Sequence, residues 1–176
     1  MLLKYIFFIS PNRAGSPRTL QRGIQGTDMP THPSHALPIL FYQDVRNALT
    51  WLEETYGFNP IVVFEDDAGA IVHAEMMLGS AHIMLGPAGM VEWAVSPQKQ
   101  HGWNTQQTYI YVDDVDAHHV GVEMMRGVTA TVPEKQFYGD KTYRTTDIEG
   151  HRWIFAERIK TASKEEMAKA TGLTVR

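Results

Sequence analysis

An internal repeat with an offset of 70 residues is the feature that most constrains the fold of this chain of 176 residues. A helix N-cap, two apolar positions of the following helix and the glycine that ends it recur together, which a chance alignment of two common β-α units does not readily produce. The repeat therefore predicts two modules of one architecture. The corresponding positions are Asp44 and Asp114, Val45 and Val115, Leu52 and Val122, and Gly57 and Gly127.

The first copy has the pattern of one strand, one helix and three strands. An apolar run over residues 36–43 predicts a buried strand, and apolar residues at helical spacing predict a helix from the cap at Asp44 to the stop at Gly57. Turn residues then separate three further β-prone runs. We expect these strands at residues 60–65, 70–77 and 81–85.

The second copy repeats this order after a long connection over residues 86–105. Trp93 and Trp103 lie in the connection, and we expect them to pack against other groups because wet tryptophan surface is costly. The expected elements are a strand at 107–112, a helix from Asp113 or Asp114 to Gly127, strands at 128–132, within 136–146 and at 151–156, and a C-terminal helix at 161–171 with a capping box at Ser163 and Glu166.

Composition limits the classes of partner. A net charge of −4 with scattered Lys and Arg argues against nucleic acid, which requires a clustered basic face. The absence of cysteine removes thiolate chemistry and fits a reducing, cytoplasmic location. The apolar run over residues 1–10 is too short to cross a membrane and makes a poor signal peptide. Residues 11–34 have linker composition, so we expect residues 1–34 to form a flexible extension.

Four segments in order, between residues 37 and 157, are similar to the vicinal oxygen chelate superfamily, which includes glyoxalase I, bleomycin-resistance proteins and extradiol dioxygenases. The resemblance implies an α+β fold in which two tandem βαβββ modules form a curved mixed sheet with a central cavity. It places a glyoxalase-like domain at 35–158, with modules at 35–86 and 106–158, before a C-terminal helix or tail at 159–176. The segments are Leu40-Phe41-Tyr42-Gln43-Asp44-Val45, His73-Ala74-Glu75-Met76-Met77-Leu78-Gly79 with residues 83–86, residues 111–118, and Tyr138-Gly139-Asp140 with Asp147, residues 149–151 and Trp153.

The resemblance also allows a test for the metal ion that many members of this superfamily bind. Each module of the metal-dependent members contributes two ligands, usually His or Glu, from its first and last strands. Strand alternation puts these positions at Leu37, Met84, Gln107 and Ile154, none of which is a His or a carboxylate. We therefore expect no metal and no cofactor. A shift in strand register leaves open a site at His35 and His82 with Glu75 or Gln107.

The same alternation predicts the lining of a ligand pocket. Leu40, Tyr42, Ile110, Val112, Trp153 and Phe155 should face the helices, which leaves the opposite face mostly apolar and aromatic with a few polar groups. The alternative is that these side chains fill a core and bind nothing. The predicted ligand-binding residues are Phe41, His82, Met84, Gln107, Tyr109, Tyr111, Arg152 and Ile154.

These observations predict a metal-free protein of the bleomycin-resistance type that binds a small hydrophobic or aromatic molecule as a homodimer, with neither nucleic acid nor a membrane as partner. The alternative is a glyoxalase-like enzyme of the lyase, isomerase or dioxygenase type, acting on a small metabolite with or without a metal. Tyr143, His82 and Glu75 are its acid-base candidates.

Overall fold

The structure is a computed structural model that describes residues 36–176. The extension predicted for residues 1–34, and His35 with it, lie outside the described residues.

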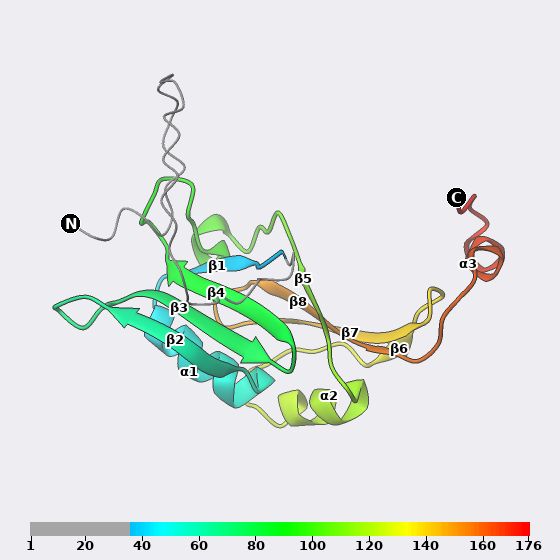
Figure 1. Cartoon of the computed structure of the whole chain (residues 1–176), viewed down its shortest axis with the longest axis horizontal. Coiled ribbons are helices and arrows are strands. Elements are labelled where there is room, and N and C mark those ends of the chain that lie inside the picture. The colour runs from blue at the N-terminus through cyan, green and yellow to red at the C-terminus, as the bar shows by residue number, and fades with distance from the viewer. Residues whose placement is uncertain (1–35) are drawn as a thin grey trace, which may run out of the picture. The chain divides into compact units, whose positions relative to one another are not determined.

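The first module has the predicted order of elements. Its sheet, here called sheet A, has the strand order β1-β4-β3-β2, in which β1 runs parallel to β4 and the other pairs are antiparallel. The helix packs on one side of this sheet (Figure 1). The elements are β1 (Ile39–Tyr42), α1 (Val45–Tyr56), β2 (Asn59–Glu65), β3 (Ile71–Leu78) and β4 (Ala81–Pro87).

The second module repeats this topology in sheet B, with the strand order β5-β8-β7-β6 and a parallel pairing of β5 with β8. The two βαβββ modules and the α+β class are confirmed, and each module builds its own four-stranded sheet. The elements are β5 (Thr108–Tyr111), α2 (Val115–Glu123), β6 (Glu134–Lys135), β7 (Asp140–Thr146) and β8 (Arg152–Arg158), with a short 3-10 helix η2 (Pro97–Gln100) in the connection and α3 (Lys164–Thr171) after β8.

Both module helices begin as the repeat predicts. The Asp44 side chain accepts a hydrogen bond from the Asn47 amide at 3.0 Å, and Asp114 accepts one from the Ala117 amide at 2.9 Å. Gly57 ends α1 in the left-handed conformation. The predicted end of the second helix at Gly127 is wrong, because the helix closes at Glu123, where the Met124 amide bonds back to carbonyl groups of the last turn.

The strand predicted at residues 128–132 is also wrong. Ala130 forms an isolated bridge to Thr145, and the regular strand β6 is shifted to Glu134–Lys135. The Thr131 hydroxyl accepts a hydrogen bond from the Arg144 amide at 2.9 Å. A side-chain oxygen therefore takes the place that a backbone carbonyl would have in a regular pairing of this segment with β7. Pro133 follows and has no amide hydrogen to donate, which separates the bridge from β6.

The core lies between the sheets and the two module helices, which cover the same side of the molecule (Figure 1). As alternation predicts, Leu40, Tyr42, Ile110, Trp153 and Phe155 are buried on the helix side, and Val112 packs against the same core. Tyr56 at the end of α1 joins the modules, because its ring lies 5.5 Å from the Trp153 ring and 4.9 Å from the Phe155 ring of β8.

The turn between β7 and β8 fastens the second module to the first. Asp147 accepts a hydrogen bond from the Tyr42 hydroxyl at 2.6 Å and one from the Trp153 indole at 3.0 Å. Glu149 accepts the backbone amides of Gln43 and Asp44 at 2.8 and 3.0 Å. Both carboxylates are buried, so these charge-assisted bonds hold the entrance of α1 against the turn.

Two histidines assist at the same junction. The Nε2 of His151 donates to the Phe41 carbonyl of the first module at 3.0 Å. His118 on α2 donates from Nε2 to the Tyr56 carbonyl at 3.0 Å, so its Nδ1 accepts from the Tyr143 hydroxyl at 2.6 Å.

The C-terminal helix α3 is capped as predicted, since Ser163 and Glu166 form a reciprocal capping box. It has no buried residue. Within residues 36–176, the helices are too short and too polar to cross a membrane.

Candidate functional site

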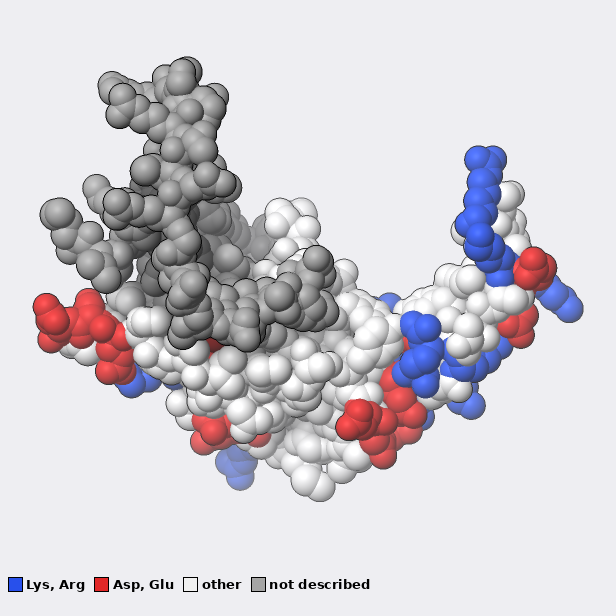
Figure 2. All heavy atoms as spheres, in the orientation of Figure 1, with Lys and Arg blue, Asp and Glu red and all other residues white. Residues whose placement is uncertain are grey.

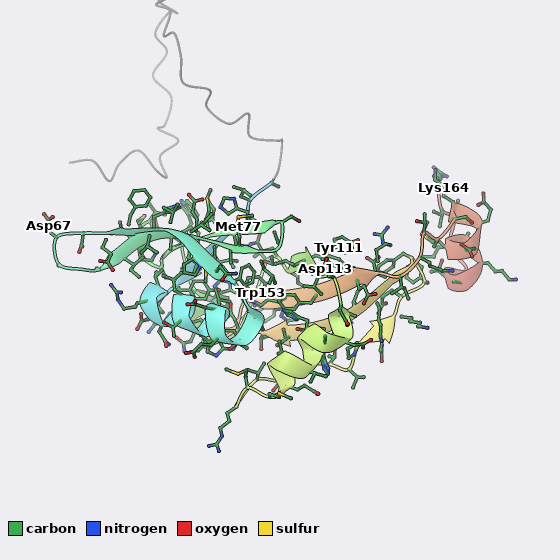
Figure 3. The ribbon with its side chains drawn as sticks, turned by 60° about the horizontal axis from the view of Figure 1, so that its bottom comes forward. Asp67, Met77, Tyr111, Asp113, Trp153 and Lys164 are labelled. Carbon is green, nitrogen blue, oxygen red and sulfur yellow. The ribbon has the colours of Figure 1, made fainter. Side chains whose placement is uncertain are left out.

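The predicted ligand-binding residues fall into two groups on the sheet faces turned away from α1 and α2. Figure 3 shows Met77 and Tyr111 on these open faces and Trp153 on the helix side. Sheet A carries Phe41, His82 and Met84, with Met84 paired to Ile39 of β1. Sheet B carries Tyr109, Tyr111, Arg152 and Ile154, with Tyr109 paired to Ile154, and Gln107 immediately precedes β5. The cavities described below each take predicted residues from one group.

The four positions predicted to correspond to metal ligands do not carry side chains that suit a metal ion. Met84 lies beside the start of β1, where its amide donates to the Pro38 carbonyl next to Leu37, and Ile154 lies beside Tyr109. Leu and Ile have no donor atom, and a thioether and an amide do not replace His and carboxylate ligands for a divalent cation. Within residues 36–176, no group of three or more His, Asp and Glu side chains is arranged to hold a metal.

Glu75 on β3 is the acidic centre of the open face of sheet A. Its two carboxylate oxygens lie 3.1 Å from His73 Nε2 and 2.7 Å from His82 Nε2. Burial raises the pKa of Glu75, but the hydrogen bonds from the two imidazoles outweigh burial and hold that pKa below its ordinary value. This group can donate or accept a proton at the sheet surface. Sequence reasoning joined Glu75 and His82 only in the alternative metal site that required a shift in strand register, and it did not place His73 beside them.

Asp140 on β7 organises the open face of sheet B. It is almost fully buried and accepts hydrogen bonds from the Tyr109 hydroxyl at 2.7 Å and the Tyr111 hydroxyl at 2.8 Å, as well as an ion pair from Arg158. Burial raises the pKa of Asp140, but the bonds from Tyr109, Arg158 and Tyr111 together lower it below its usual range. The guanidinium of Arg158 also lies over the Tyr111 ring, 5.4 Å from its centroid.

This cluster orients the two predicted tyrosines, whose rings lie 5.5 Å apart edge to face. Burial and the bond to Asp140 raise the pKa of Tyr109, so its hydroxyl stays protonated and acts as a donor. Sequence reasoning missed Arg158 and used Asp140 as a family marker alone. Their pairing depends on the observed strand register, in which Asp140 lies opposite Arg158, and Arg158 lies beyond the strand predicted at residues 151–156.

The connection between the modules forms the wall of two hollows that share Trp103, Asn104, Thr105 and Gln106. One, of about 680 Å³, is lined by apolar residues that include Ile39, Phe41 and Trp93. The other, of about 650 Å³, contains Gln107 and Arg152. Both volumes suit a small-molecule ligand.

The expectation that both tryptophans of the connection are packed is wrong. Trp93 meets the edge of the Phe41 ring at 5.5 Å, yet it is 67% exposed, and Trp103 is 79% exposed. The backbone explains this, because the Trp103 amide donates to the Gln100 carbonyl at 2.9 Å and Asn104 donates to the Gly150 carbonyl at 2.9 Å. These bonds fix the loop with the Trp103 ring outward.

Two βαβββ modules with free sheet faces opposite their helices define the vicinal oxygen chelate class. The sequence matches the family described as the Glyoxalase/Bleomycin resistance protein/Dioxygenase superfamily over residues 32–155. The chain therefore belongs to this superfamily. No curated protein sequence matches it.

Solved structures with the same fold include antibiotic-binding proteins. TioX from Micromonospora sp. ML1 is 26% identical, with a TM-score of 0.57, and the match covers 74% of this chain and 100% of TioX. TnmS3, an antibiotic binding protein from Streptomyces sp. CB03234, is 19% identical, with a TM-score of 0.55 and coverage of 72% and 98%. A bleomycin-binding protein complexed with bleomycin is 14% identical, with a TM-score of 0.52 and coverage of 71% and 98%. TnmS3 and the bleomycin-binding protein are less than 25% identical to this chain, so their similarity to it shows the shared fold alone.

Proposed function

We propose that this protein binds a small hydrophobic or aromatic molecule without a metal ion. The observation that carries the proposal is the chemistry of the four ligand-equivalent positions, three of which are Leu37, Met84 and Ile154. Apolar side chains there remove the Lewis acid of the metalloenzymes and leave an apolar surface. The descriptions of TnmS3 and of the bleomycin-binding protein as binders of antibiotics support the same class of ligand.

The proposed binding residues are those of the two open faces. Rings from Phe41, Tyr109 and Tyr111 offer flat apolar surface, and Gln107 and Arg152 offer polar contacts. His82, Met84 and Ile154 complete the set.

A homodimer accounts for the division of these residues between two sheets. The open faces carry Tyr109 and Tyr111, which are exposed aromatic side chains in one chain. If sheet A of one protomer faces sheet B of its partner, the two groups line one cavity and the exposed apolar surface is covered. We propose such a dimer in the cytoplasm, because a chain without cysteine forms no disulfide and therefore does not need an oxidising compartment.

A small molecule also suits the charge distribution better than nucleic acid does. On the face that Figure 2 shows, basic side chains gather at the C-terminal end, acidic groups lie beside them, and the middle is largely uncharged. Binding to phosphate backbones requires a continuous basic face.

Calorimetric titration of chelator-treated protein tests the proposal. Bleomycin and a set of planar aromatic antibiotics are the probes, and at least one should bind with one site per protomer. The Met84→Lys variant, which puts a charge on the open face of sheet A, should weaken binding at least tenfold, whereas Lys169→Met on α3 should not. If no probe binds or shifts the melting temperature, the proposal is wrong.

Glu75 favours a second candidate function, a metal-independent lyase or isomerase. Its carboxylate lies between His73 and His82 on the same open face, and such a group can transfer a proton to or from a bound metabolite. Under this candidate, Glu75→Gln abolishes turnover of an identified substrate while leaving its binding nearly intact. Under the first candidate, no metabolite is consumed by the unaltered protein.

A further inference from the structure

We propose that the ligand is a planar aromatic molecule that carries an anionic group, and that Arg144 and Arg152 recognise the anion while Trp103 contacts the ring. This inference rests on the proposed function, because it specifies the chemistry of the molecule bound. It adds Arg144, Trp103 and three threonines to the predicted binding residues.

The first observation is a pair of neighbouring arginines that have no acidic partner in the part of the chain that the structure describes. In the β7–β8 hairpin, Arg144 pairs with Ile154 and Thr146 pairs with Arg152, so the two arginines are diagonal neighbours on the open face of sheet B. Neither forms an ion pair with any residue from 36 to 176. Neighbouring like charges without a counter-charge are unfavourable, and an anionic ligand would remove this repulsion.

The second observation is the surroundings of these arginines. They line a hollow of about 210 Å³ whose other polar residues include Gln107, Thr129, Thr131 and Thr146. Hydroxyl and amide groups donate hydrogen bonds to an anion, and none of the lining residues in the described part of the chain is a carboxylate that would compete with it. The chemistry of this hollow therefore suits a carboxylate, sulfonate or phosphate group.

The third observation is the position of Trp103 beside this cationic region. Gln107 and Arg152 also line the hollow of about 650 Å³ in which Trp103 is a wall residue, and Trp103 also lines the apolar hollow with Phe41 and Trp93. Among residues 36–176, no carboxylate lines either of these hollows. Trp103 thus lies between an apolar region and a cationic region. An aromatic molecule with an anionic group has one apolar part and one negatively charged part, so it matches both regions.

The fixed backbone of the loop supports a recognition role for Trp103. His101, at a φ of 55°, and Gly102, at a φ of 80°, turn the chain, and hydrogen bonds on both sides of Trp103 hold it. An exposed ring on an ordered loop can contact a ligand ring with little loss of conformational entropy.

Three probes that share the naphthalene ring and differ in the charge of one substituent test the proposal by calorimetric titration of the full chain. They are naphthalene-2-carboxylate, naphthalene-2-methanol and the naphthalen-2-ylmethyl trimethylammonium ion. We expect the carboxylate to bind at least tenfold more tightly than the alcohol and the ammonium ion to bind most weakly. Arg152→Gln and Arg144→Gln should each bring the ratio of carboxylate to alcohol affinity close to one. Arg126→Gln, an exposed arginine after α2, is the matched control and should keep the ratio.

Tryptophan fluorescence locates the ring. The chain has four tryptophans, so quenching by the carboxylate should persist in Trp51→Phe and be reduced by more than half in Trp103→Phe. Equal affinities for the three probes, or a carboxylate preference that Arg152→Gln does not change, would overturn this inference and leave the proposed function intact. If neither these probes nor any aromatic antibiotic binds, both proposals are wrong.

Discussion

The hydroxyl of Tyr42 donates a 2.6 Å hydrogen bond to the Asp147 carboxylate, although 105 residues separate them in the chain. The bond joins β1 of the first module to the last turn of the second. Because Trp153 donates to the same carboxylate, one buried charge fixes the first strand, the turn and the core of the second module together. The turn that identifies the family is therefore the structural junction between its two modules.

Replacement of Asp147 by Asn should destabilise the protein by about 3 kcal/mol, because buried donors lose a charged acceptor. Tyr42→Phe removes one of these donors and should cost about 1–2 kcal/mol. Urea denaturation of both single variants and the double variant measures the coupling, and the double variant should be more stable than the sum of the losses predicts. Asp113→Asn, at an exposed aspartate, is the control. Additive losses would contradict a direct interaction.

Replacement of Gly139 by Ala should be far more damaging than the same change at Gly89. Both glycines have positive φ, but a Cβ at Gly139 would lie 2.2 Å from the Lys160 carbonyl oxygen, whereas one at Gly89 would meet nothing within 4 Å. We expect a loss of about 1–2 kcal/mol for Gly89→Ala from backbone conformation alone, and about 3 kcal/mol or more for Gly139→Ala. Equal shifts in the midpoints of thermal unfolding for the two variants would show that the Lys160 carbonyl, which follows β8, does not lie against Gly139.

His118 should make stability depend on pH. Burial lowers the pKa of His118 below its ordinary value of 6.5, although the bond to the Tyr56 carbonyl opposes this effect. The unfolded chain therefore takes up the proton first, and the stability that neutral His118 contributes is present above pH 6.5 and is lost as the pH falls. Urea denaturation at pH 7.5 and 5.5 should show a smaller pH effect in His118→Gln than in the unaltered protein. His101→Gln, at an exposed histidine, should leave the pH effect unchanged. The same difference in the free energy of unfolding between pH 7.5 and pH 5.5 in all three proteins would contradict the role given to His118.

Replacement of Asp140 by Asn should weaken both stability and ligand binding. Tyr109 and Tyr111 lose the charged acceptor that orients their rings, and we expect a loss of about 2 kcal/mol in the free energy of unfolding. Binding of an aromatic antibiotic should weaken several-fold. Asp116→Asn, which removes the exposed partner of Lys141, should change neither quantity appreciably. If Asp140→Asn left the affinity unchanged, Tyr109 and Tyr111 would not be part of the binding surface.

Much of the fold was predictable because local signals and the repeat agree. Asp44 and Asp114 cap their helices, and alternation gave the correct faces for residues such as Tyr42 and Trp153. The strand predicted at residues 128–132 does not form, because the side-chain hydroxyl of Thr131 accepts a hydrogen bond from the neighbouring strand and hydrophobic periodicity carries no record of such a bond.

The candidate site was less predictable, because its polar groups meet across strands. Nothing in the sequence pairs Glu75 with both His73 and His82, or Asp140 with Arg158, until strand registers are known. The outward position of Trp103 depends on hydrogen bonds of the connection, and burial propensity alone predicted the opposite.

The most direct test of the central claim is the metal dependence of ligand binding. One aromatic ligand is titrated into protein dialysed against EDTA, and again after addition of one equivalent of Mn²⁺, Fe²⁺, Ni²⁺ or Zn²⁺. Because Leu37, Met84 and Ile154 occupy three of the four positions predicted to correspond to metal ligands, we predict the same affinity and stoichiometry in every sample and no stoichiometric metal retained after gel filtration. Binding that requires one of these ions, together with one tightly held ion per protomer, would contradict the account.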